Sequence, residues 1–96
     1  MTPTTRVALL VLVVAACKHS ATGVAECDAH LERRRACADQ IGGELGQSIA
    51  READRLEATW ASAAKRNVKG WKDKYGRKWC TAAGVDARTA FPECRW

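Results

Sequence analysis

The stretch CDAHLERRRAC, residues 27–37, places a cysteine at each end of one segment with helical periodicity. Two further cysteines, Cys80 and Cys94, lie far along the chain. A disulfide from each end of this segment would join the first helix to a distant part of the chain at a defined level. The fold therefore depends on which distant cysteine Cys27 reaches and which one Cys37 reaches.

Apolar residues recur at steps of three and four over most of the chain, as they do on one face of an α-helix. This spacing predicts helices over about 24–41 and 44–67, separated by a glycine pair, and a third helix from about residue 69. Asp86 is predicted to cap a short last piece over 87–91. No strand is predicted, because β-branched residues are few and no alternating run occurs outside the N-terminal apolar segment. The predicted fold is all-α, a small three-helix up-down-up bundle or a helical hairpin stapled by two disulfides.

Helix geometry favours one pairing of the four cysteines. At about 1.5 Å per residue, Cys27 lies roughly 22 Å and Cys80 roughly 20 Å below the turn between the first two helices. Cys37 lies roughly 8 Å below the same turn, and Cys94 returns close to that level if the third segment is mostly helical. Parallel first and third helices therefore favour Cys27–Cys80 with Cys37–Cys94. The nested pairing, Cys27–Cys94 with Cys37–Cys80, stays open and belongs to a hairpin that resembles mitochondrial twin C-x9-C proteins, although only the first two cysteines have that spacing.

The four cysteines are interpreted as disulfides and not as metal ligands. Structural zinc sites favour cysteines about two to four residues apart, whereas 9, 42 and 13 residues separate successive cysteines here. A chain of this length builds a core that is marginal alone. Each disulfide would contribute on the order of 4 kcal/mol by closing a long loop. No metal and no cofactor is predicted.

The N-terminal segment is typical of an export signal. Residues 1–16 hold one positive charge and then the apolar run VALLVLVVAA, which is too short for a permanent transmembrane helix. The run ends in Val14-Ala15-Ala16-Cys17, which resembles the lipobox of bacterial lipoproteins, with Val where that family prefers Leu. The resemblance implies a lipid anchor on Cys17 and a tether over residues 17–23. The alternative is ordinary signal cleavage, which would leave Cys17 free or disulfide-bonded.

The lipobox resemblance also implies a cellular location. Lys18 follows the modified cysteine, where an Asp signals inner-membrane retention in the better-known bacterial sorting rule. The expected location is therefore the outer membrane, facing the periplasm, with two or more acyl chains as a stable anchor. The folded domain is expected over 24–96. Without Arg6, the mature chain keeps 15 basic residues against 11 acidic ones, a net charge of +4.

The mature sequence also resembles small uncharacterised lipoproteins of myxobacteria. These carry the pattern C-D-x-[YH]-L-x-x-x-x-x-C in the first helix, a Trp late in the second, and two further cysteines. Here the pattern corresponds to residues 27–37, followed by Trp60, Cys80 and the closing ECRW. The resemblance implies a four-cysteine helical lipoprotein and brings no assigned activity.

The strongest binding candidate is KRNVKGWKDKYGRKW, residues 65–79. It combines basic side chains, which attract anionic surfaces, with Trp and Tyr, which suit a boundary between apolar and aqueous surroundings. For a tethered protein, the anionic surface would be lipid headgroups, lipopolysaccharide or acidic groups of the cell wall. The candidate residues are Lys65, Arg66, Lys69, Trp71, Lys72, Lys74, Tyr75, Arg77 and Lys78.

A structural interpretation competes with this one. Trp71, Tyr75 and Trp79 fall on one face of a regular helix and would form core, while the cations solvate the other face. Trp79 would then pack against the disulfide of the neighbouring Cys80. Nucleic acid also attracts such charge, but an exported protein does not meet it, so no nucleic-acid partner is predicted.

No catalytic constellation is predicted. His19 lies in the tether, and His30 has no second histidine at ligand or triad spacing. Asp28 and Glu32, one turn apart, are typical of an exposed helix face. We therefore expect a non-enzymatic, lipid-anchored module with a binding or structural role in the cell envelope. The alternative is an inhibitor or stress-response protein that acts on an exported enzyme through residues 65–79.

Overall fold

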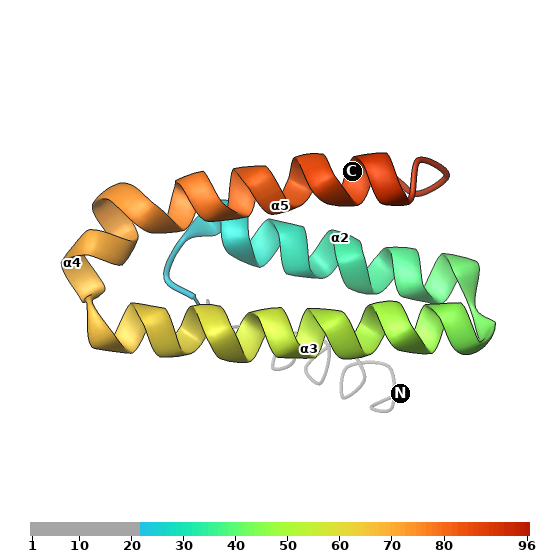
Figure 1. Ribbon diagram of the computed structural model, residues 1–96, viewed down its shortest axis with the longest axis horizontal. Coiled ribbons are helices and arrows are strands. Elements are labelled where there is room, and N and C mark those ends of the chain that lie inside the picture. The colour runs from blue at the N-terminus through green and yellow to red at the C-terminus, as the bar shows by residue number, and fades with distance from the viewer. Residues whose placement is uncertain (1–21) are drawn as a thin grey trace, which may run out of the picture.

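Three helical rods make up the computed structural model of the chain, which describes residues 22–96 (Figure 1). The first two rods are α2 (Ala25–Ile41) and α3 (Gly43–Arg66). The third is continuous through α4 (Val68–Gly70), a π-helical turn η1 (Trp71–Tyr75) and α5 (Gly76–Ala90). The predicted all-α, up-down-up bundle is confirmed, and residues 22–96 contain no strand.

The predicted signal peptide, the lipidation site Cys17 and most of the predicted tether lie outside the described residues. Among residues 22–96, no helix is both long and apolar enough to cross a membrane.

Glycines and an asparagine side chain set the turns between the rods. Gly42 and Gly43 have φ angles of 69° and 62°, in the left-handed region that glycine adopts without strain. The N–H of Gly42 donates to the carbonyl of Ala38 at 2.9 Å, which closes the end of α2. At the other turn, the side chain of Asn67 accepts from the N–H of Gly70 at 3.1 Å and caps α4. The rods therefore reverse direction without long loops.

Both predicted disulfides of the favoured pairing are present, so the nested pairing is excluded. Cys27 bonds to Cys80 with a Cα–Cα distance of 5.0 Å, and Cys37 bonds to Cys94 with 5.3 Å. In Figure 1, α2 lies between α3 and α5, and it is the rod to which both disulfides attach. Matching helix levels from the rise per residue was sufficient to find this register.

The buried residues form two clusters, one around each disulfide. The cluster at the Cys27–Cys80 end consists of Val24, Cys27, Leu31, Ala53, Trp60, Trp71 and Cys80. The cluster at the Cys37–Cys94 end is smaller and consists of Cys37, Ala38, Ile49 and Cys94. Gly46 permits the close crossing of α2 and α3 there, because a Cβ at this position would lie 2.5 Å from the carbonyl oxygen of Ala38.

The π-helical turn changes which residues of the third rod are buried. Trp71, Gly76 and Cys80 are buried, at steps of five and then four residues. A π turn accommodates one more residue than an α turn, so Gly76 and Cys80 follow Trp71 onto the core face. Tyr75 and Trp79 are displaced, and they are 45% and 62% exposed. The expectation that all three aromatic residues form core is right for Trp71 and wrong for the other two.

Gly76 makes this arrangement sterically possible. A Cβ there would lie 2.7 Å from the carbonyl oxygen of Trp71 and 2.8 Å from a methyl carbon of Val24. The third rod therefore approaches the start of α2 as closely as a glycine allows. The predicted break before residue 87 is absent, because α5 continues to Ala90 and Asp86 lies within it.

Hydrogen bonds tie the first residue that the structure describes to the bundle. Thr22, assigned to the tether by the sequence, is 1% exposed. Its carbonyl accepts from Nε1 of Trp71 at 2.8 Å, and its hydroxyl lies 3.0 Å from Oδ1 of Asp28. The N–H of Val24 donates to the same hydroxyl oxygen at 3.2 Å. The folded part of the chain therefore includes Thr22, and Asp28 helps to hold it.

Candidate functional site

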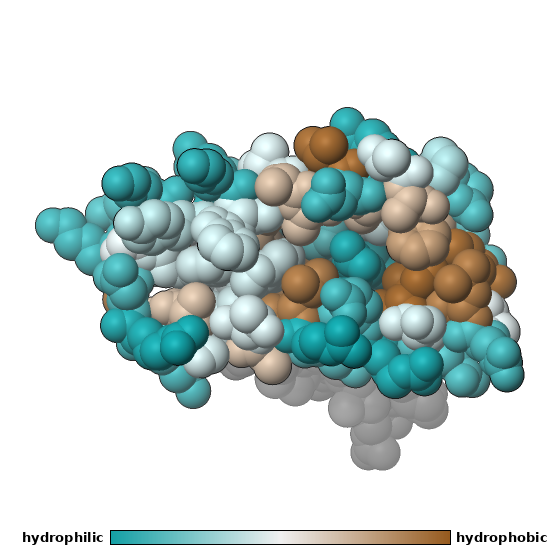
Figure 2. All heavy atoms as spheres, viewed as in Figure 1, coloured by the Kyte–Doolittle hydropathy of each residue, from teal (hydrophilic) through white to brown (hydrophobic). Residues whose placement is uncertain are grey.

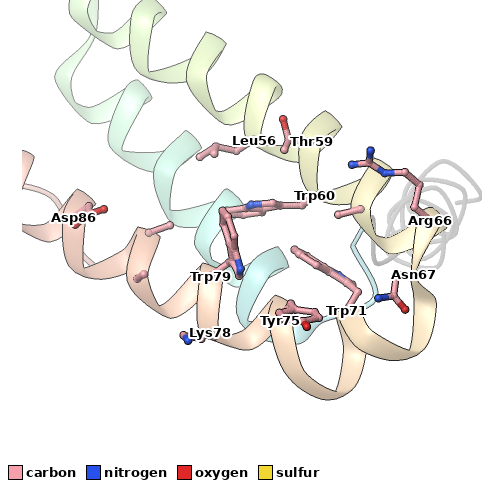
Figure 3. Close-up of a pocket in the computed structure, with 13 residues that line it drawn as sticks. Leu56, Thr59, Trp60, Arg66, Asn67, Trp71, Tyr75, Lys78, Trp79 and Asp86 are labelled. Carbon is pink, nitrogen blue, oxygen red and sulfur yellow. The ribbon is translucent and has the colours of Figure 1, made fainter.

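A groove of about 680 Å3 lies between α3 and the third rod, and its wall is mostly apolar (Figure 3). We call it the aromatic groove. Because the π turn moves Tyr75 and Trp79 off the core face, both side chains line it. The lining residues are Leu56, Thr59, Trp60, Ala63, Arg66, Asn67, Trp71, Tyr75, Lys78, Trp79, Ala82, Ala83 and Asp86.

Four aromatic rings from three elements define the shape of the groove. Trp60 comes from α3, Trp71 and Tyr75 from η1, and Trp79 from α5, and Figure 3 shows all four between the two rods. Trp60 and Trp71 are 4% and 5% exposed, so they are fixed in the core and form the floor. Tyr75 and Trp79 form an accessible wall above them. A rigid apolar floor with an exposed aromatic wall can hold an apolar group in a fixed position.

The polar side chains of the groove are Thr59, Arg66, Asn67, Lys78 and Asp86. Asn67 is already engaged as the cap of α4. Within residues 22–96, Arg66 and Lys78 take part in no ion pair, although both are exposed. The groove therefore offers two cations to one carboxylate, Asp86. This set of groups favours an apolar ligand that also carries negative charge.

The structure distributes the predicted anionic-surface residues over three hollows, and Lys72 and Lys78 each border two of them. Arg66 and Lys78 line the aromatic groove, together with Trp71 and Tyr75. Lys65 and Lys72 lie instead beside Thr22, where the described chain begins, with Lys69 nearby on α4. Lys72, Lys74, Arg77 and Lys78 surround a shallow hollow around Asp73.

The cations around that hollow have neighbours of their own. Arg77 pairs with Glu26 of α2 at 3.1 Å. Nζ of Lys74 lies 5.4 Å from the centre of the Tyr75 ring, at the distance of a cation–π contact. The cations of residues 65–79 therefore differ in their immediate surroundings, although Lys72 and Lys78 link the hollows that they border.

His30 lies between the two core clusters and is 4% exposed. Its ring centre is 5.9 Å from that of Trp60 and 5.8 Å from that of Trp96, on which it stacks. Nε2 of His30 accepts from Nε of Arg34 at 3.2 Å. Burial, and secondarily the charges of Arg34 and Arg33, lower the pKa of His30 from 6.5 to about 4. His30 is therefore a neutral core residue at physiological pH.

The contribution of α3 to the groove was not predicted. Leu56 and Trp60 belong to the apolar face of the helix predicted over about 44–67. The signal that could have found them is the width of this face: Thr59, Ala63 and Arg66 extend it to one side at helical spacing. Within residues 22–96, no group of three or more His, Cys, Asp or Glu side chains is placed to hold a metal ion.

Comparisons of the chain with protein-family models, with curated proteins and with solved structures found no match. The interpretation of the aromatic groove therefore depends on its own residues.

Proposed function

We propose that the chain is a lipid-anchored protein of the bacterial envelope, attached through Cys17, and that it is a non-enzymatic binding module. We further propose that the aromatic groove holds an acidic amphipathic helix of another exported protein. The observation that carries the proposal is the exposure of Tyr75 and Trp79, at 45% and 62%, beside a groove of about 680 Å3. Ligand-binding pockets of proteins are typically about 300–1,000 Å3, with mostly apolar walls.

The exposed aromatic wall supplies the energetic argument. Large aromatic side chains on a rigid backbone are typical of the residues that dominate binding energy at protein interfaces. Trp79 is held by α5, one residue before the Cys27–Cys80 disulfide, so its backbone is constrained before binding. Little conformational entropy of the backbone would then be lost when a partner covers it.

The arrangement of the rods supports a helix as the occupant. The groove runs between α3 and the third rod, which are antiparallel, are joined by the turn at Asn67 and flank α2 in Figure 1. An amphipathic helix that lies in a groove between two helices is a common mode of recognition, and it would complete a four-helix arrangement here. Its apolar face would contact Trp60, Trp79 and Leu56.

Charge supports an acidic partner. Arg66 on α3 and Lys78 on α5 stand on the two sides of the groove, with no ion pair to other described residues. Carboxylates that flank the apolar face of a bound helix would pair with both. The alternative, an inhibitor or stress-response protein that acts on an exported enzyme, would use the same contacts and differs only in the identity of the partner.

Photo-crosslinking of the full lipoprotein in intact cells tests the proposal. A photoreactive phenylalanine analogue replaces Trp79 in one strain and Val85 in a matched strain. Both positions are exposed on α5, at 62% and 55%, but only Trp79 lines the groove. We expect position 79 to capture one peptide with acidic and apolar residues at helical spacing, and position 85 not to capture it. Mass analysis of the same protein would show acyl groups on Cys17.

Variants of the groove then test whether the captured peptide is a genuine ligand. Arg66→Gln with Lys78→Gln should weaken its binding to the lipoprotein at low salt, whereas Arg51→Gln with Arg88→Gln removes the same charge elsewhere and should not. Lipid alone captured at position 79, or a peptide without acidic residues, would contradict the proposed partner. An unmodified Cys17 would contradict the anchor.

A further inference from the structure

The N-terminal segment leaves the bundle at a basic surface. Thr22 and Gly23 lie beside a hollow of about 220 Å3 whose other lining residues include Lys65, Val68 and Lys72. The terminal carbon of the Lys72 side chain lies 3.4 Å from the position that a Cβ on Gly23 would take. We call the residues Lys65, Val68, Lys69 and Lys72 the exit surface.

The exit point is fixed by hydrogen bonds. Nε1 of Trp71 donates to the carbonyl of Thr22 at 2.8 Å, and the N–H of Thr22 donates to Asp28 at 3.2 Å. Five residue steps separate Thr22 from Cys17, and a fully extended chain spans at most about 17 Å over that length. By contrast, α3 has 24 residues and is about 36 Å long. An anchor at Cys17 therefore holds the exit surface, and not the opposite end of the bundle, close to the membrane.

The composition of the exit surface fits an anionic membrane. Lys65, Lys69 and Lys72 are exposed and belong to no ion pair within the described residues. Val68 lies among them and is 57% exposed. Basic residues attract the negative surface potential of anionic lipids, and an apolar side chain between them can enter the headgroup region. The three cations would add electrostatic binding to the hydrophobic anchor.

We infer that the exit surface docks on anionic lipid headgroups, so that the bundle stands on the membrane at its α4 end. This inference rests on the proposed anchor at Cys17. Lys65, Lys69 and Lys72 contact the headgroup phosphates, and Val68 inserts between them. The rods then point away from the bilayer, and the aromatic groove, which runs along them, opens to the side. A partner helix would enter the groove from the side, moving parallel to the membrane surface. It would bind with its axis along the rods, which point away from the bilayer.

Flotation with vesicles of two compositions separates the anchor from the exit surface. The detergent-purified full chain is reconstituted with vesicles of phosphatidylcholine alone, or of phosphatidylcholine mixed with phosphatidylglycerol. Amine-reactive labelling followed by mass spectrometry then measures the accessibility of Lys69, with Lys78 as the internal reference. We expect flotation with both vesicles and slower labelling of Lys69 relative to Lys78 only where phosphatidylglycerol is present. High salt should abolish that difference, because it screens the charges.

The outcomes distinguish the two proposals. Flotation with the anionic vesicles alone, with Lys69 protected, would contradict the anchor and support the exit surface. Flotation with both vesicles but equal labelling of Lys69 would support the anchor and overturn the docking surface. Flotation with neither would overturn both.

A pair of matched variants completes the test. Lys65→Gln with Lys72→Gln removes two cations from the exit surface and leaves Lys69 as the reporter, whereas Arg51→Gln with Arg88→Gln removes two cations elsewhere. Each cation near an anionic surface changes the docking equilibrium roughly fivefold. We therefore expect protection of Lys69 to be largely lost in the first variant and kept in the second. Equal protection in both variants would overturn the inference.

Discussion

The two ends of the bundle use the same covalent bond for different purposes. At the Cys27–Cys80 end, the disulfide joins two helices that already pack around Trp60 and Trp71. At the Cys37–Cys94 end, it joins α2 to the non-helical tail after Ala90. The two bonds span similar sequence separations, 53 and 57 residues. The difference teaches that one disulfide reinforces the packing of two helices, whereas the other fixes a non-helical tail to a helix.

The surfaces of the two ends also differ. In Figure 2, pale residues flanked by teal hydrophilic ones cover the end near α4, whereas brown apolar residues gather at the opposite end. Other contacts also hold the tail there: Phe91 and Trp96 pack against the smaller cluster, Nε2 of Gln40 donates to the carbonyl of Glu93 at 2.9 Å, and Trp96 stacks on His30. Leu45 at the start of α3 is 52% exposed. The Cys37–Cys94 end therefore has the smaller core.

The largest expected effect compares one tryptophan from each end. Trp71 and Trp96 each donate the indole N–H to a backbone carbonyl at 2.8 Å, that of Thr22 and that of Phe91. Trp71→Ala should cost about 3–5 kcal/mol of unfolding free energy, because it opens a cavity in the larger core. Trp96→Ala should cost roughly 1 kcal/mol, because the ring is half-buried and its bond lies within the tail. Chemical denaturation monitored by circular dichroism measures both, and equal losses would contradict the comparison.

Removing each disulfide in turn gives the next largest effect. Loop lengths alone predict a loss of about 4 kcal/mol for either bond. Cys27→Ala with Cys80→Ala should lower the unfolding free energy by this full amount, since the remaining core keeps the two helices packed in the native state. Cys37→Ala with Cys94→Ala should lower the unfolding free energy by roughly half of this amount. Without this bond the tail also becomes free in the native state, and that gain in native-state entropy offsets part of the entropy gained by the unfolded chain. Chemical denaturation monitored by circular dichroism measures both losses of unfolding free energy. Faster proteolysis after residue 90 in the variant without Cys37 and Cys94 would be a second sign of a loosened tail.

Acid should destabilise the fold through His30, which contacts Trp60 of the larger core cluster and Trp96 of the tail. Its pKa is lowered to about 4 in the folded protein, so the unfolded chain takes up a proton first as the pH falls below 6.5. The stabilisation from neutral His30 is therefore complete above about pH 6.5 and is lost toward and below pH 4, by on the order of 3 kcal/mol in total. His30→Phe should flatten this part of the stability curve, whereas His19→Gln should leave it intact. Identical curves for wild type and His30→Phe would refute the assignment.

The smallest effect concerns an ion pair near the Cys37–Cys94 end. Arg35 of α2 contacts Glu57 at 2.7 Å and Asp54 at 3.0 Å, both on α3. The hydrogen bond to Glu57, followed by that to Asp54, raises the pKa of Arg35. Because these groups are partly exposed, Arg35→Gln should cost only about 0.2–1 kcal/mol and the cost should fade at high salt. A loss that persists in high salt would mean that packing, and not charge, is responsible.

Sequence reasoning predicted the rods and their register because both follow from regular helix geometry. The predicted helices over 24–41 and 44–67 differ by at most one residue at each end from α2 and α3. The favoured disulfides needed only the rise per residue and the positions of the cysteines. Glycines at positions 42 and 43 marked the first turn correctly.

The candidate site was predicted only in part, because one extra residue in a helical turn leaves no clear periodic signal. Tyr75 and Trp79 keep α-helical spacing from Trp71 in the sequence, although the π turn places them on another face. Gly76 lies within the third predicted helix, and its missing Cβ is what lets the rod touch Val24. The cations of residues 65–79 were found, but their distribution over three hollows depends on tertiary placement.

The hydrogen bonds at Thr22 determine how the molecule would bear mechanical load. Tension applied through the N-terminal segment reaches Thr22 first, where the bonds to Trp71 and Asp28 resist it. If these give way, the pull advances only as far as Cys27, whose disulfide passes it to Cys80 and into α5. Peeling of the chain thus stops at a covalent bond before it reaches the interior of α2, and the wall that carries Trp79 stays connected to the point of attachment.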